Sequence, residues 1–100
     1  MKDEDVLTIA YRRIVEARLS DLLEKGEIGL PANAIQSLVF DYHHARFKAY
    51  VTQMLSLFGS SKIPLDDDQV ISVTQDAWNY FPHRSLRGRC PVEVFREIGH

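Results

Sequence analysis

The stretch WNYFPHRSLRGRCPVEVF, residues 78–95, contains a helix stop and a helix start with a short basic segment between them. Pro82 ends a helix because its ring lacks the amide donor and clashes with the preceding turn. Pro91 suits the first turn of a helix, and Glu93 then stands at the third position of a capping box. The stretch therefore predicts a C-terminal helix–loop–helix hairpin. Its structural residues are Trp78, Phe81, Pro82, Leu86, Gly88, Cys90, Pro91, Glu93 and Phe95.

The apolar residues of this hairpin have expected packing roles. Leu86 is the only apolar residue available to fold back and fix the loop, so we expect it to be buried. The last helix has an apolar surface made of Val92, Val94, Phe95 and Ile98. We expect this surface to dock near Trp78 and Phe81, because aromatic clusters dominate small helical cores.

Upstream of the hairpin, apolar residues also recur at helical spacing. Residues from about 4 to 25 place Leu7, Ala10, Ile14 and Ala17 at 3-4-3 intervals, which marks one apolar face. Other apolar residues lie on other sides of the same helix, namely Ile9, Val15, Leu19 and Leu23. Residues 31–58 contain no internal helix breaker and predict one long helix, with a kink or break as the alternative. No strand alternation and no hairpin turn is present. We predict a single all-α domain over residues 1–100, a small bundle of about four helices.

Composition indicates a globular protein of a reducing compartment. Hydrophobic residues make up 45% of the 100 residues and the formal net charge is −2, which disfavours disorder. The single Cys excludes an internal disulfide and a cysteine-based zinc site. The start of the sequence is acidic and has no apolar h-region, and no apolar run is long enough to span a bilayer. We predict a cytoplasmic protein without membrane contact.

The basic residues of the hairpin loop form a candidate anion site. His83, Arg84, Arg87 and Arg89 lie close together in the sequence, and guanidinium groups suit phosphate or carboxylate. The alternative is a solvated loop that pairs with the acidic first helix. Residues 82–100 hold four arginines and two glutamates, a net of +2, which is too small for strong non-specific nucleic-acid binding.

Asp41, His43 and His44 are the candidate metal ligands. On a continuous helix Asp41 and His44 would face the same side, while His43 would point about 100° away. Two ligands do not make a site, so further ligands would have to come from a second copy of the chain. We favour histidines without a metal, and we expect no cofactor. The aspartates at 66–68 lack calcium-loop spacing and favour a helix cap.

Cys90 and His83 share the loop and form a candidate thiol–imidazole pair. The neighbouring arginines would lower the pKa of the thiol. No third group is evident to orient the imidazole, and no signature of a cysteine hydrolase is present. Cys90 also stands at the cap position of the last helix, where a hydroxyl would serve better.

Residues 78–95 resemble the C-terminal tail of insertion-sequence transposases with an integrase-type core. That tail often reads N-x-x-P-R-x-x-L-G-x-x-T-P-x-E-x-F. This chain supplies Asn79, Pro82, Leu86, Pro91, Glu93 and Phe95 at the same spacing, and departs at His83, Arg87 and Cys90. The resemblance implies a docking hairpin near nucleic acid. The helical residues upstream show no strand pattern for the catalytic core, so no catalytic residue carries over.

The leading hypothesis is a non-catalytic helical protein that acts through protein–protein contacts. Both long predicted helices are apolar on more than one side, which favours self-association, most simply as a homodimer. A second protein is the alternative partner. The next hypothesis is a nucleic-acid-associated accessory protein that uses the loop 83–89, and the third is a metal- or thiol-dependent enzyme.

Overall fold

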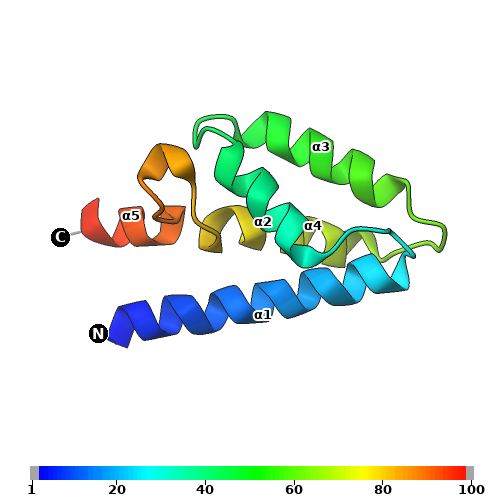
Figure 1. Cartoon of the computed structure of the whole chain (residues 1–100), viewed down its shortest axis with the longest axis horizontal. Coiled ribbons are helices and arrows are strands. Elements are labelled where there is room, and N and C mark those ends of the chain that lie inside the picture. The colour runs from blue at the N-terminus through cyan, green and yellow to red at the C-terminus, as the bar shows by residue number, and fades with distance from the viewer. Residues whose placement is uncertain (1–2, 99–100) are drawn as a thin grey trace.

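Helix α1, residues Asp3–Lys25, runs along most of the length of the molecule, and the remaining helices pack along one side of it (Figure 1). The computed structural model describes residues 3–98. After α1 the chain forms α2 (Ala32–Asp41), α3 (Phe47–Gly59), α4 (Asp67–Tyr80), the short 3-10 helix η1 (Arg84–Leu86) and α5 (Pro91–Ile98). Within the described range the only strand-like pairing is an isolated bridge in the hairpin loop. The all-α prediction is confirmed.

The segment predicted as one long helix over residues 31–58 is two helices. α2 ends at Asp41 and α3 begins at Phe47, and Tyr42 between them has an extended backbone with ψ 133°. A continuous helix of this length would extend about 40 Å and place only one stripe on the core. The break turns the chain back, so both halves bury a face. The buried residues are Ile35 and Val39 of α2, and Tyr50, Met54 and Phe58 of α3.

The apolar sides predicted for α1 have different surroundings. The stripe Leu7, Ala10, Ile14 and Ala17 faces solvent, with 57% of Leu7 and 52% of Ile14 exposed. A different stripe is buried against the other helices, namely Val15, Leu19, Leu22 and Leu23. The physical reason is the apolar area that each stripe offers. Four large side chains remove more surface from water than two large ones and two alanines.

The turn after α1 places its left-handed residue at Glu27, whose φ is 53°. The amide of Ile28 donates to the carbonyl of Leu23 at 2.9 Å, which is the long hydrogen bond of a Schellman motif. Gly26 is required for a different reason, because a Cβ there would come within 2.9 Å of the Ser61 Cβ. The end of α1 is therefore packed tightly on the connection between α3 and α4.

The connection into α4 confirms the predicted helix cap. A carboxylate oxygen of Asp66 accepts a hydrogen bond from the amide of Gln69 at 3.1 Å. α4 then runs between α1 and α3 and contributes to the centre of the core, where Trp78 and Phe81 are buried as predicted. No helix in the described part of the chain is long and apolar enough to cross a membrane.

Candidate functional site

The hairpin between α4 and α5 forms as predicted, and the loop is closed by its own backbone. The amide of His83 donates to the carbonyl of Arg89 at 3.0 Å, and the amide of Gly88 donates to the carbonyl of His83 at 2.9 Å. Gly88 has a φ of +82°, which favours glycine. At the start of α5, the amide of Cys90 donates to the carboxylate of Glu93 at 3.1 Å, as the capping box predicts.

His83 fixes the loop to the body of the protein. Its side chain is completely buried, whereas Leu86, the expected anchor, is only partly buried. Nε2 donates to the carbonyl oxygen of Trp78 at 2.9 Å, and Nδ1 lies 3.4 Å from the carbonyl oxygen of Tyr42. A buried ring between two carbonyls cannot reach an external anion. Nothing in the sequence pattern predicts this role, because a histidine in a polar loop has no apolar periodicity.

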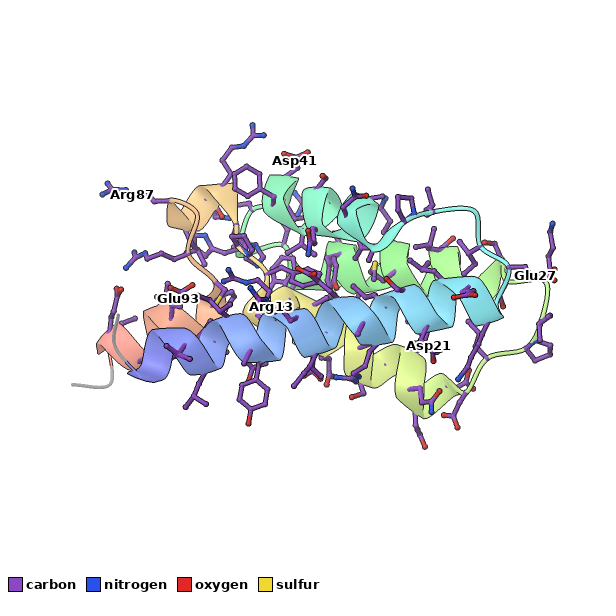
Figure 2. The ribbon with its side chains drawn as sticks, turned by 60° about the horizontal axis from the view of Figure 1, so that its bottom comes forward. Arg13, Asp21, Glu27, Asp41, Arg87 and Glu93 are labelled. Atoms are coloured by element: carbon purple, nitrogen blue, oxygen red, sulfur yellow. The ribbon has the colours of Figure 1, made fainter. Side chains whose placement is uncertain are left out.

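The loop arginines do not converge on one site. Arg84 donates to Asp41 at 2.7 Å, and Arg89 pairs with Glu97. Arg87 is exposed, and Figure 2 shows it at the tip of the loop pointing away from the helices. The expected pairing of this loop with α1 is wrong, because the acidic partners lie on α2 and α5. The candidate anion residues therefore form no common binding site.

The candidate metal residues also separate. The break after Asp41 removes the helix on which Asp41 and His44 would have shared a face. The rings of His43 and His44 stack with their centroids 4.2 Å apart, and Nδ1 of His44 lies 3.0 Å from the hydroxyl oxygen of Ser85. Asp41 is engaged by the loop arginine. No group of three His, Cys, Asp or Glu side chains within residues 3–98 has a geometry that could hold a metal ion.

Cys90 is buried, and this position opposes nucleophilic chemistry. Burial raises the pKa of its thiol, so the thiolate that a nucleophile requires is disfavoured. The ring nitrogens of His83 face backbone carbonyls, as described above, and not an activated sulfur. The predicted thiol–imidazole pair is therefore without support in the geometry.

Helix α5 faces the body of the protein with its polar side. Arg12 of α1 donates to the carbonyl of Tyr80 at 2.7 Å and to Glu93 of α5 at 3.4 Å. Arg96 of α5 donates to the hydroxyl of Thr8 on α1. These contacts turn the apolar side of α5 outward. The expectation that Phe95 and Ile98 dock into the core is wrong, because 70% and 75% of these residues are exposed.

An open apolar groove lies between α5, the loop, α4 and the start of α3. We call it the α5 groove. Its volume is about 540 Å³. Of the residues predicted to dock α5 on the core, Val94, Phe95 and Ile98 line this groove, and their spacing also suits an exposed binding face. The groove is lined by His44, Phe47, Gln75, Trp78, Asn79, Leu86, Pro91, Val94, Phe95 and Ile98.

The outward stripe of α1 is the second exposed apolar surface. We call it the α1 stripe, and it comprises Val6, Leu7, Ala10, Tyr11, Ile14 and Ala17. Tyr11 stacks on Tyr80 of α4 with the ring centroids 5.4 Å apart, while about half of its surface remains exposed. The start of α1 and the end of α5 lie at the same end of the molecule (Figure 1).

No family model, curated protein or solved structure matches the chain. The resemblance of residues 78–95 to a transposase tail therefore stays a prediction.

Proposed function

We propose that the protein is a non-catalytic helical module that acts through protein–protein contacts and associates with itself. The observation that supports this most directly is the α1 stripe. A helix in a chain of this size has turned a regular row of apolar residues outward, where it stays in contact with water. Contiguous exposed apolar patches on a small domain are characteristic of interaction surfaces.

The polar groups support a non-catalytic role. The residues suited to chemistry are each engaged separately: His83 by backbone carbonyls, Cys90 by burial, and Arg84 and Arg89 by carboxylates. A nucleic-acid partner has weaker support, because the salt bridges neutralise two of the loop arginines. The proposed location is the cytoplasm, where a lone cysteine stays reduced.

The strength of the association follows from the area of the stripe. Val6, Leu7, Tyr11 and Ile14 each expose about half of their surface. Covering those halves contributes about 1 kcal/mol per side chain, or about 8 kcal/mol from two copies. Association costs about 4–15 kcal/mol in lost rigid-body freedom. Even against the lower cost the net gain is about 4 kcal/mol, which corresponds to a dissociation constant of about 1 mM or weaker. Such a dimer forms and dissociates with concentration.

Sedimentation velocity over a range from about 10 µM to 1 mM tests the proposal. We expect the wild-type mass to rise from monomer towards dimer. A variant with Leu7→Glu and Ile14→Glu, the stripe variant, should stay monomeric with an unchanged circular dichroism spectrum. Ser37→Glu with Ser56→Glu adds the same charge at other exposed positions and should behave as the wild type. A wild-type protein that is monomeric throughout contradicts the proposal.

A further inference from the structure

We propose that two copies of the chain pair stripe to stripe, with their α1 helices antiparallel. This inference rests on the proposed self-association and names its geometry. The partner that fits the α1 stripe is then the same stripe of a second copy. The two copies are related by a two-fold axis that crosses α1 midway along the stripe.

The centre of the stripe alternates large and small side chains along the helix. Its exposed residues follow one another at intervals of three, four and three positions, in the order Leu7, Ala10, Ile14 and Ala17. These intervals are the same in both directions, whereas reversing the direction exchanges the large and the small positions. A reversed copy therefore places its Ala17 opposite Leu7 and its Ile14 opposite Ala10. Facing positions of opposite size interdigitate without leaving gaps.

A parallel pair lacks this complementarity. Its two-fold axis runs along the helices, so each residue faces its own copy. Ile14 would then meet Ile14, and Ala10 would meet Ala10. The large side chains would hold the helices apart at the levels of the alanines, and the alanines would lose contacts there. The sizes of the side chains therefore favour the antiparallel pair.

The area that a dimer needs also favours pairing between two stripes. The gain estimated for the proposed self-association counts the exposed halves of Val6, Leu7, Tyr11 and Ile14 on both copies. A contact that covers the stripe of one copy only provides about half of that gain. Half of the gain leaves no net stabilisation even against the lower end of the cost of association. Stripe-to-stripe pairing covers both stripes in one contact.

The rest of the molecule leaves room for this pairing. The other helices pack along one side of α1, where Val15 and Leu19 are buried (Figure 1). The stripe lies on the opposite side of α1, so two copies can approach helix to helix. The small side chains of Ala10 and Ala17 allow the two helix axes to come within about 8 Å of each other.

The charge of Arg13 opposes the pairing to a small extent. Arg13 is exposed and borders the stripe, one residue from the level of the two-fold axis, so the antiparallel pair brings its two copies towards each other. Its long side chain can extend past the edge of the stripe and keep the guanidinium in water. Charges that stay in water interact weakly, so the packing of the stripes outweighs this repulsion.

An exchange of side-chain sizes tests the pairing of facing positions. Leu7→Ala should raise the dissociation constant about tenfold or more, because it leaves a gap opposite Ala17. Adding Ala17→Leu to Leu7→Ala exchanges the large and the small residue, and sedimentation velocity at about 1 mM should again show the wild-type mass. The matched control adds Ala45→Leu instead, on the exposed connection between α2 and α3 across the molecule from α1, and should not restore the dimer (Figure 1). An exchange variant that stays as monomeric as Leu7→Ala overturns the pairing.

Disulfide trapping tests the direction of the two helices. In a Cys90→Ser background, Leu7→Cys and Ala17→Cys are made as two separate proteins and oxidised alone and as a mixture at about 1 mM. The antiparallel pair places the two different positions opposite each other and two identical positions about 15 Å apart along the helix axis. A disulfide requires Cα atoms within about 7 Å, so we expect covalent heterodimers from the mixture and little product from either protein alone.

The other outcomes separate this inference from the proposed function. Covalent homodimers of the Leu7→Cys protein would show parallel helices and overturn the inference. A wild type that dimerises in sedimentation velocity, while the mixture forms no covalent heterodimer, overturns the antiparallel pairing and leaves the proposed function standing. A wild type that is monomeric throughout overturns both.

Discussion

Replacing Leu19 and Leu7 separately with Ala compares the two faces of α1 with the same chemical change. Leu19 is fully buried and Leu7 is 57% exposed. Leu19→Ala loses the transfer free energy of the deleted carbons and leaves a cavity, so the free energy of unfolding should fall by about 3–4 kcal/mol. Leu7→Ala loses under half of the transfer free energy and leaves no cavity, so the loss should be about 1 kcal/mol or less. For a domain of this size each kilocalorie lowers the melting temperature by about 4–8 °C.

The assay is thermal and urea unfolding followed by circular dichroism at about 1 µM, where the proposed dimer is dissociated. We expect the melting temperature of Leu19→Ala to fall by about 12 °C or more, and that of Leu7→Ala by no more than about 8 °C. At high concentration Leu7→Ala should lose additional stability, because the dimer no longer stabilises the fold. Equal destabilisation by the two substitutions at low concentration would refute the orientation of α1.

Four further predictions concern the core. Trp78→Ala should lower the free energy of unfolding by about 3–5 kcal/mol in a urea titration. The reason is that the Trp78 ring is buried, with its centroid 4.7 Å from that of Tyr50 and 4.4 Å from that of His83. An unchanged midpoint of the urea titration would contradict the burial of Trp78. Tyr50→Phe removes the hydroxyl hydrogen bond to the Thr74 carbonyl at 2.6 Å and should cost about 1 kcal/mol by the same titration. Burial raises the pKa of the Tyr50 phenol and the pKa of the Cys90 thiol, so at alkaline pH the folded chain keeps protons that the unfolded chain releases. The free energy of unfolding should therefore fall as pH rises past 9.0, the ordinary pKa of the thiol, and then past 10.0, the ordinary pKa of the phenol. Cys90→Ser should change the free energy of unfolding at pH 7 by about 1 kcal/mol or less. It should also remove the loss of stability that begins above pH 9.0. The same pH profile in the wild type and in Cys90→Ser would argue against a buried thiol.

The sequence signals that act over one or two helical turns predicted the local structure correctly. Pro82 and Pro91 place the end of α4 and the start of α5, and Glu93 caps the new helix as its position predicts. These effects depend on backbone geometry and on neighbours within four residues, so they need no knowledge of the rest of the fold.

The break between α2 and α3 at residues 42–46 could not be predicted from such local signals. No proline or glycine marks it, and each half is a good helix by itself. The break exists because two short helices bury more surface than one long helix beside α1 and α4, which is a property of the assembled core. The predicted Asp41–His44 pair failed for this reason.

The sequence by itself determined that the chain is helical, where the hairpin turns, that α1 and the segment 31–58 are apolar on more than one side, and that α5 has an apolar side. Only the tertiary structure decided which side faces inward. The spacing of apolar residues identifies an apolar face of a helix but does not show what that face packs against. Which face becomes buried depends on the total apolar area that is removed from water when all the helices are assembled. α1 buried its leucine-rich side and α5 was held by its polar side. The interaction surface proposed for this protein is the apolar face of α1 that remains exposed to solvent after the core has formed.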